Sequence, residues 1–327
     1  MTPLLAIVIP TRNRAGAIQK YALSSLERSD FRDFACVVQD ASDDDLTREA
    51  VEERPWNFEV SYVRATRTGS SSQRNDAVRR VLTELPGVRY IVFMDDDSEL
   101  SSDALSGVLA SFRESGASIV NIRTKPVAPP SFRSKMTQGL KRVLGTNRHG
   151  ATAFLYNYGG NDEATGEVEW ASGCGMGVDV SVFREWHIFF PEEFERFGGY
   201  ALGEDFAFSF FVSQRKRGRI VNSAYGHLLH YAAGSARLDV RNMAASKWYN
   251  FHLLFDAIYE SGKNAGGPGR RWLRAKFGLF MCAAAVKLLL RARSLDVASV
   301  LRGIFAARAA LKDYRRNHDI RTLMSEK

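Results

Sequence analysis

The chain has 327 residues, of which 45% are hydrophobic and 25% charged, and it carries a formal net charge of +8. This balance is ordinary for a globular protein and excludes a disordered or collagen-like chain. The three cysteines, Cys36, Cys174 and Cys282, lie far apart. Neither a disulfide framework nor a thiolate zinc site is therefore expected, and a reducing cytosolic compartment fits best.

The first element is the apolar run "LLAIVIP" at residues 4–10. A continuous apolar run is typical of a strand that is buried on both faces of a parallel sheet. The run leads directly into a turn and basic residues, which is the reverse of the order in a secretory signal, so no such signal is expected. Helical spacing of apolar residues follows over 17–28.

Strands and helices then alternate along the chain. The strands are predicted at "FACVVQDASDDD" (34–45), "EVSYVRA" (59–65), "RYIVFMDDD" (89–97) and "SIVNIR" (118–123), and the helices at 71–85 and 101–116. This alternation predicts an α/β fold with a doubly wound, mostly parallel sheet. Ligands of such sheets bind beyond the carboxyl ends of the strands.

The pattern weakens over 126–168, which includes a proline-rich connection and a glycine-rich excursion. Beyond it, a helix is predicted to begin near Glu204, with a strand and loop after it. Residues 240–261 have the spacing of an amphipathic helix. Residues 270–316 are expected to be helical, with an interruption near 294–296.

Four acids gather at the end of the fourth predicted strand: Asp95, Asp96, Asp97 and Glu99. Capping the next helix needs only one acid, and residues 101–103 can supply it. A hard cation such as Mg²⁺ or Mn²⁺ prefers oxygen ligands, usually carboxylates together with phosphate oxygens. The cluster therefore predicts a divalent cation site.

Two further stretches suggest nucleotide contacts. Asp40 ends its strand, where an acid could accept hydrogen bonds from a base or ribose or could form an Asx turn. Residues 68–78, "TGSSSQRNDAV", place amide and hydroxyl donors ahead of a helix, as suits a diphosphate. Arg74 could add a cationic fork there. The stretch lacks the lysine signature of a P-loop.

Acids and histidines in the second half offer candidates for proton transfer and coordination. Glu204 and Asp205 stand at the expected start of a helix, where either could cap the helix or act as a general base. His227 and His230 lie three residues apart. One of them could complete a cation's coordination or hold a phosphate, and the other would be structural.

The C-terminal region is strongly basic. Residues 263–327 contain fifteen Lys and Arg against four Asp and Glu. The apolar stretch 277–286 is about half the length that a bilayer core requires. Trp272, Phe277 and Phe280 among basic residues suit a helix that lies in a membrane interface, and a core-packing helix with a basic face is the alternative.

These stretches, taken in order, resemble the family 2 glycosyltransferases, which have the GT-A fold. The matching segments span about residues 4–255 and are "IVIPTRNR", "QDASDD", "GSSSQRNDAV", "IVFMDDDSEL", "VEWASGCGMGVDVSVF", "FGGYALGED" and "HYAAGS". The later segments look most like the bacterial branch with rhamnosyl- and galactofuranosyl-transferases. The resemblance implies a GT-A domain over 1–262, with a nucleotide-binding half (1–125) and an acceptor half (126–262), and a basic helical extension over 263–327.

The resemblance also implies a role for each matching residue. Asp205 would be the catalytic base with Glu204 beside it, and Trp170 and Gly173 would border the acceptor and donor sugar. The metal ligands would be Asp97, Asp95 and His230. Contacts with the donor nucleotide would come from Pro10, Thr11, Arg14, Asp40, Gln73, Arg74, Asn75, Asp95 and Asp96.

The expected function is inverting transfer of a sugar from a nucleotide-diphosphate sugar, UDP- or dTDP-linked, with Mn²⁺ or Mg²⁺ as cofactor. The acceptor would be a hydroxyl of a glycan or lipid-linked glycan in bacterial cell-surface polysaccharide assembly. The enzyme would be cytoplasmic and peripheral at the inner face of the plasma membrane, with its C-terminal region on the anionic surface and no nucleic acid partner.

Two alternative functions remain open at this point. A sugar-nucleotide nucleotidyltransferase shares the α/β topology and metal use, but its expected glycine-rich first loop is poorly matched by "PTRNRAG". A non-catalytic membrane-associated scaffold on the same fold is disfavoured by the intact set of acids.

Overall fold

The computed structural model describes residues 3–125, 127, 166–168, 170–199, 201–231, 240–259 and 297–323, together with positions 275, 277, 278, 281 and 282. Most of the predicted proline-rich and glycine-rich connections lies outside these residues. The same is true of the expected domain boundary at 262/263, the helical interruption near 294–296 and most of the stretch 277–286.

The core of the fold is an eight-stranded sheet of order β3-β2-β1-β4-β9-β6-β10-β8. Strand β9 runs antiparallel to both of its neighbours and β8 is antiparallel to β10, whereas the other pairs are parallel. The doubly wound, mostly parallel sheet is thus confirmed. Its strands are β1 (Leu5–Thr11), β2 (Phe34–Asp40), β3 (Glu59–Arg64), β4 (Tyr90–Met94), β6 (Ile119–Asn121), β8 (Gly166–Glu167), β9 (Gly175–Asp179) and β10 (Ile220–Asn222).

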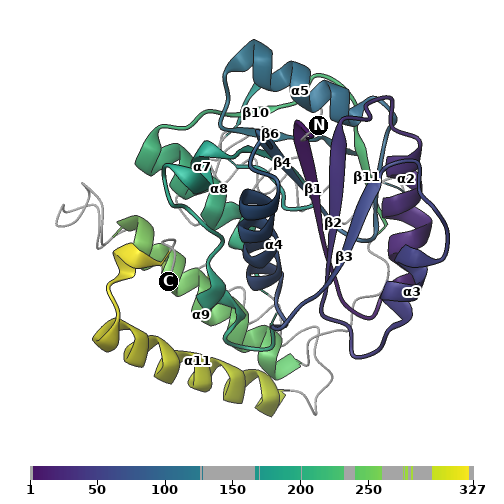
Figure 1. The fold of residues 1–327 in the computed structure, drawn as a ribbon. Helices are drawn as coiled ribbons and strands as arrows, with labels where there is room; N and C mark the ends of the chain where they lie inside the picture. Colours follow the sequence, from purple (N-terminus) through teal and green to yellow (C-terminus); the bar gives the residue numbers. More distant parts are fainter. Residues whose placement is uncertain are drawn as a thin grey trace.

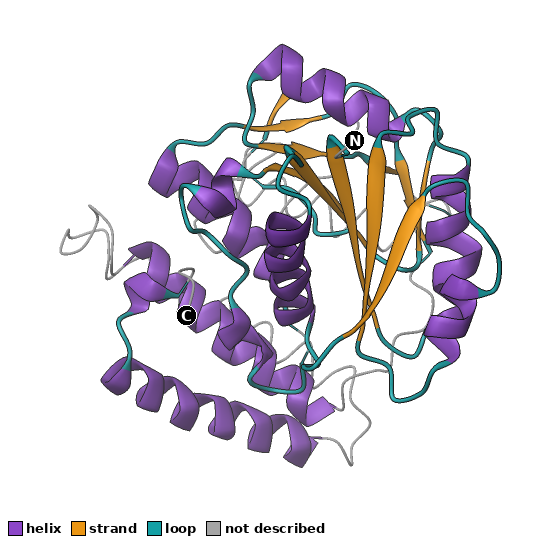
Figure 2. Ribbon diagram, viewed as in Figure 1, coloured by secondary structure: helices purple, strands orange, loops and turns teal. Residues whose placement is uncertain are grey.

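Helices cover both faces of this sheet (Figures 1 and 2). They are α1 (Ala15–Ala17), the π-helix η1 (Ile18–Leu23), α2 (Ser24–Glu27), α3 (Leu46–Glu52), α4 (Ser70–Glu84), α5 (Ala104–Ser115), α7 (Ser181–Arg184), the 3₁₀ helix η2 (Glu192–Glu195), α8 (Glu204–Lys216), α9 (Val240–Tyr259), α11 (Val297–Asn317) and the 3₁₀ helix η4 (Ile320–Thr322).

The alternation of side chains along β1 explains the two layers. Ile7 and Ile9 are buried in one hydrophobic cluster with residues of η1, α2 and α5. Ala6 and Val8 are buried in the other cluster, with residues of α4, α8, α9 and α11. Because successive side chains of a strand point to opposite faces, an uninterrupted apolar run is what a sheet covered on both sides requires. The strand prediction at 4–10 is therefore confirmed.

A second, three-stranded sheet was not predicted. It has the order β5-β11-β7 and comprises β5 (Ser98–Leu100), β7 (Thr124–Lys125) and β11 (Leu228–His230). Strand β5 begins directly after the three aspartates and pairs antiparallel with β11, so that His230 lies opposite Ser98. Strands of two or three residues carry too little periodicity to be recognised in a sequence.

The C-terminal helix α11 packs along α9 and contributes Ala307, Leu311 and Tyr314 to the core. Phe277, which was predicted for a membrane-interface helix, is buried and stacks on Phe255 of α9 with ring centroids 4.4 Å apart. No helix within the described residues is long and apolar enough to span a bilayer.

Gly303 sets the distance between α9 and α11. A Cβ atom at this position would lie 2.3 Å from the carbonyl oxygen of Arg241. We expect Gly303→Ala to separate the two helices and to destabilise the fold by about 1–3 kcal/mol, as overpacking usually does. The measurement is urea unfolding. Gly16→Ala is the matched control because its added Cβ meets nothing within 4 Å, and equal stability of the two variants would contradict this role of Gly303.

Candidate functional site

A pocket of about 380 Å³ opens at the carboxyl ends of β1 and β4. This size is within the range of small-molecule sites. Ten of the predicted site residues line it, and seven others complete it. The lining is Pro10, Thr11, Arg12, Asn13, Arg14, Thr68, Gly69, Ser70, Gln73, Arg74, Asp95, Asp96, Asp97, Gly198, Gly199, Glu204 and His230.

The carboxylate of Asp97 pairs with two basic side chains, one on each oxygen. One oxygen is 3.1 Å from Nε2 of His230 and the other is 3.0 Å from the guanidinium of Arg14. Burial acts to raise the pKa of Asp97, but the hydrogen bond and charge of His230 and the charge of Arg14 outweigh it and hold the pKa below its usual range. Asp97 is therefore a carboxylate at neutral pH.

The three predicted metal ligands come together in the structure. Ligand atoms of Asp95, Asp97 and His230 all lie within 4.8 Å of one another. The pairing of β5 with β11 carries His230 to this position, whereas His227 does not belong to the group. Two carboxylates and an imidazole fit a divalent cation such as Mn²⁺, and bound phosphate oxygens could fill its remaining positions.

Asp96, which is buried like Asp97, anchors the first loop. It accepts hydrogen bonds from the Thr11 hydroxyl at 2.6 Å and from Arg14 at 2.7 Å. Burial raises the pKa of Asp96 to about 6, although Thr11 and Arg14 act in the opposite direction. Arg14 thus joins two adjacent aspartates and offsets part of their mutual repulsion.

Arg74 joins the aspartates to the start of α8. Its side chain is 4% exposed and forms ion pairs with Asp95 at 3.1 Å and with Glu204 at 2.7 Å. A Cβ atom on residue 173 would lie 2.9 Å from this guanidinium, so the close approach of Arg74 requires Gly173. Arg74 was predicted to contact a diphosphate, and its bridge between two acids was not predicted.

The two acids at the start of α8 have different partners. Glu204 lines the pocket and is held by Arg74. Asp205 accepts hydrogen bonds from the backbone N–H of Gly173 at 3.2 Å and of Phe206 at 2.7 Å. Burial raises the pKa of both carboxyls, against the effect of Arg74.

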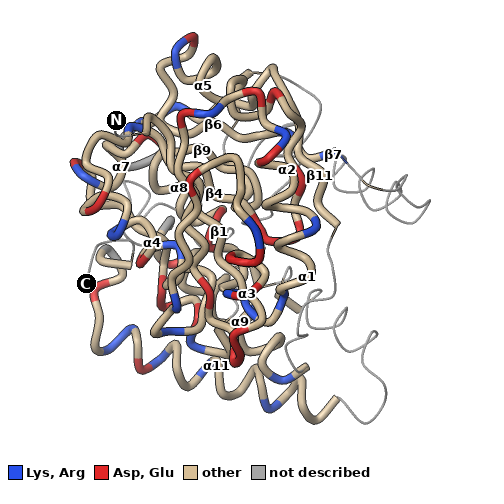
Figure 3. The backbone as a smooth tube through the Cα atoms, turned by 45° about the vertical axis from the view of Figure 1, so that its right-hand side comes forward, with Lys and Arg blue, Asp and Glu red and all other residues tan. Residues whose placement is uncertain are grey.

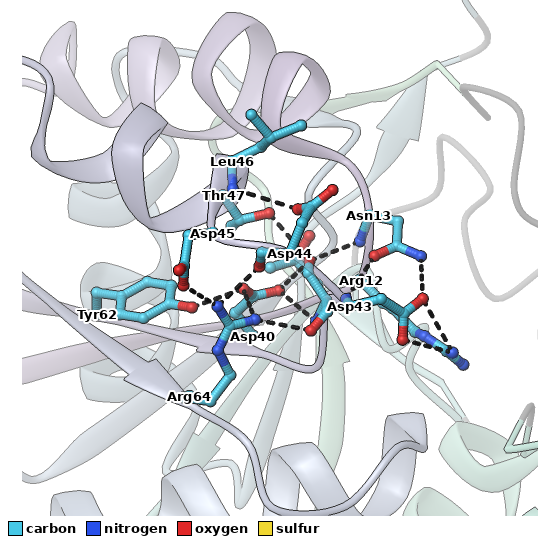
Figure 4. A network of polar contacts seen from close by, with 12 residues as sticks. Arg12, Asn13, Asp40, Asp43, Asp44, Asp45, Leu46, Thr47, Tyr62 and Arg64 are labelled. Atoms are coloured by element: carbon cyan, nitrogen blue, oxygen red, sulfur yellow. Dashed lines mark hydrogen bonds and ion pairs between the residues drawn. The ribbon is translucent and has the colours of Figure 1, made fainter.

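Several residues that were predicted to contact the nucleotide form hydrogen bonds within the protein. Gln73 lines the pocket and donates to the carbonyls of Thr11 and Gln39 at 2.9 and 2.8 Å, so it ties β1 to β2. Asn75 lies away from the pocket, where its amide bonds to Phe190. Asp40 is fully buried; Figure 4 shows it facing Tyr62 and Arg64.

Asp40 and Asn75 do not line the pocket, nor do Trp170, Gly173 and Asp205. A nucleotide could reach Asp40 only if the hydrogen bonds from Ser42, Tyr62 or Arg64 were displaced. Figure 4 also shows that Arg12 and Asn13 form hydrogen bonds with Asp43. These bonds hold the loop after β1 in place.

Glu195 is a residue of the site region that sequence reasoning missed. Its carboxylate accepts a hydrogen bond of 2.7 Å from the N–H of Ser72 at the start of α4. It therefore occupies part of the helix terminus that was predicted to bind a diphosphate. The two residues are 123 positions apart, and no local signal in the sequence indicates their contact.

Residues 6–186, over half of the chain, match the family described as Glycosyl transferase family 2, and the chain belongs to this family. One curated relative is the GalNAc(5)-diNAcBac-PP-undecaprenol beta-1,3-glucosyltransferase of Campylobacter jejuni, which is 28% identical over 120 residues. The match covers 36% of this chain and 37% of the relative, well under two thirds of its length.

Solved structures support the fold. The mannosyltransferase PcManGT from Pyrobaculum calidifontis, in complex with GDP-Man and Mn²⁺, aligns with a TM-score of 0.54 at 18% identity over 97% of this chain and 83% of that one. S. aureus TarS aligns with a TM-score of 0.52 at 18% identity over 84% of this chain and 42% of that one. At such identities the likeness concerns the fold, and the expected GT-A architecture is confirmed.

We expect Gly173→Ala to displace Arg74 by a few tenths of an ångström and to lower kcat about tenfold, because catalytic geometry is sensitive to such shifts. Steady-state kinetics of Gly173→Ala, Arg74→Lys and the double variant check this. If Gly173 acts through Arg74, the losses are not additive. Fully additive losses would contradict the coupling.

Glu195 provides a pH-dependent contribution to stability. Burial raises its pKa from 4.5 to about 7, although the Ser72 amide acts in the opposite direction. The folded chain therefore holds this proton more tightly than the unfolded chain, and we expect the contribution of Glu195 to stability to decrease as the pH rises from about 4.5 to about 7. Glu195→Gln does not titrate, so its melting temperature should rise relative to wild type across this interval.

Melting temperatures between pH 4 and 8 provide the measurement, with the exposed Glu185→Gln as control. A constant difference between Glu195→Gln and wild type over this range would contradict the assignment.

Proposed function

We propose that the chain is an inverting glycosyltransferase that uses a nucleotide-diphosphate sugar, UDP- or dTDP-linked, as donor and Mn²⁺ or Mg²⁺ as cofactor. The observation that carries the proposal is the convergence of Asp95, Asp97 and His230 in one pocket with Glu204. Family membership supports the reaction class. PcManGT, whose structure contains GDP-Man and Mn²⁺, supports this kind of donor and cofactor for the fold.

Within the proposed reaction the residues of the pocket have distinct tasks. The cation would be held by Asp95, Asp97 and His230. When bound, it would neutralise the negative charge that develops on the diphosphate leaving group. Thr11 and Arg14 line the same pocket and would bind the nucleotide part of the donor. Arg74 would keep Glu204 and Asp95 at a fixed separation.

Asp205 is proposed as the base that takes the proton from the acceptor hydroxyl, and Glu204 as its partner. The ion pair with Arg74 fixes the position of Glu204. Within the described part of the chain, Asp205 accepts hydrogen bonds from two backbone N–H groups, one on each oxygen, so each oxygen keeps a lone pair for a proton. Its raised pKa favours proton uptake.

The proposed acceptor is a hydroxyl of a glycan or lipid-linked glycan in bacterial cell-surface polysaccharide assembly. By its name, the Campylobacter relative acts on an undecaprenol-linked glycan, which supports this class. Trp170 would border the acceptor, since its buried indole N–H has no hydrogen-bond partner among the described residues. The enzyme would work in the cytoplasm, peripheral at the inner face of the plasma membrane.

Two variants separate donor binding from chemistry. We expect Asp97→Asn to lose cation-dependent binding of the donor, because the ligand group loses a charged carboxylate. We expect Asp205→Asn to bind the donor normally and to lower transfer at least a hundredfold, because the base is lost. Calorimetry with UDP-, dTDP- and GDP-sugars, with and without Mn²⁺, and product assays with a glycan acceptor give the two readouts.

The control for these variants is Asp33→Asn, an exposed acid at the opposite end of the sheet. It should match wild type in both assays. Absence of cation-dependent binding of any nucleotide sugar by the wild-type chain would overturn the proposed function.

A further inference from the structure

Helix α11 carries apolar side chains on two faces. Its inner face is buried against α9 through Val300, Gly303, Ala307, Leu311 and Tyr314. On the outside, Val297, Leu301 and Phe305 are exposed by 37%, 44% and 64%. These three residues recur every four positions and therefore form one row along the helix, which we call the outer row.

The outer row is unusual for this protein. It supplies three of the six large hydrophobic side chains that are exposed among the described residues. Single exposed apolar residues are normal, whereas a contiguous group marks an interaction surface. A helix that is apolar on both sides is expected to be covered on both sides.

The packing of α11 fixes the outer row on the outside. Gly303 brings the backbone of α11 against the Arg241 carbonyl. Near the other end of the helix, Arg315 forms two hydrogen bonds of 2.7 and 2.9 Å with the buried carboxylate of Asp256. Rotation of α11 to bury the outer row would break both contacts, so what covers the row must come from outside the described core.

The charges beside the outer row identify the chemistry of that partner. Arg302, Arg308, Lys312 and Arg316 are exposed on α11, and Asp313 is its one acid. Figure 3 shows the basic positions spread along the helix. An apolar row flanked by cations is typical of a helix that lies on an anionic lipid surface. A second copy of this chain would bring the same cations against one another.

Helix α9 connects this surface to the pocket. Tyr249 donates to Glu193 at 2.6 Å and Asn250 donates to the Phe194 carbonyl at 3.0 Å, so α9 holds η2. Gly198 and Gly199, which follow η2, line the pocket. In Figure 1, α9 and α11 lie at the lower end of the molecule, opposite the N-terminal end of β1.

We propose that Val297, Leu301 and Phe305, with the neighbouring Arg302 and Arg308, form the surface that docks the chain on an anionic lipid bilayer. This inference rests on the membrane location in the proposed function and assigns the contact to α11. With α11 docked on the membrane, α9 would be the one helix between α11 and the pocket wall at Gly198 and Gly199. The pocket would then be within reach of a lipid-linked acceptor.

The test uses the full chain and co-sedimentation with vesicles of phosphatidylcholine, with or without phosphatidylglycerol. We expect binding to the anionic vesicles that weakens as salt is added. Leu301→Ser with Phe305→Ser should weaken it about tenfold or more. Arg302→Gln with Arg308→Gln should remove the preference for phosphatidylglycerol. Leu46→Ser is the matched control, since Leu46 is 57% exposed on α3.

Melting temperatures of all variants establish that they are folded. Failure of wild type to bind anionic vesicles, or equal binding by the Leu301/Phe305 variant and Leu46→Ser, would overturn the proposal. A dimer by light scattering that the Leu301/Phe305 variant converts to monomer, with vesicle binding unchanged, would assign the outer row to a second copy instead. Cation-dependent donor binding without vesicles tests the glycosyltransferase function separately and should persist in this variant.

Discussion

The ion pairs around three consecutive aspartates are the interaction on which the rest of this site depends. Adjacent carboxylates at the end of a buried strand repel one another unless cations neutralise them. Arg14 binds Asp96 and Asp97, Arg74 binds Asp95, and His230 lies between Asp95 and Asp97. These partners come from the first loop, α4 and β11, so compensation of the charge also brings three distant segments together.

Arg74 shows how charge compensation organises the chemistry. It joins Asp95 to Glu204 and so fixes the distance between the candidate metal ligands and the acids of α8. A buried arginine between two carboxylates is costly to desolvate and is stabilised only while both partners remain in place. The pocket thus has a defined shape, as pre-organised catalysis requires.

Patterns within a single segment could be predicted from the sequence, and contacts between segments could not. The apolar run at 4–10, the apolar run before the acids at 95–97 and the helix after Gly203 each have a local signal, and the structure confirms these two strands and this helix. The hydrogen bonds from Tyr62 and Arg64 to Asp40 depend on tertiary packing. So does the contact of the Glu195 carboxylate with the N-terminus of α4. The same limit explains why the outer row on α11 is visible only once its inner face is known.

The short pairing between β5 and β11 has an evolutionary consequence. The register of this pairing places His230 beside Asp97, although the two residues are 133 positions apart in the sequence. The N–H of Tyr231 adds a 3.0 Å hydrogen bond to the carbonyl oxygen of Asp97. Loops between these strands can lengthen or diverge without altering that register, since closing a longer loop costs little. Selection can therefore change the surface around the pocket while the contact between Asp97 and His230 stays intact, so that one scaffold could accommodate different substrates.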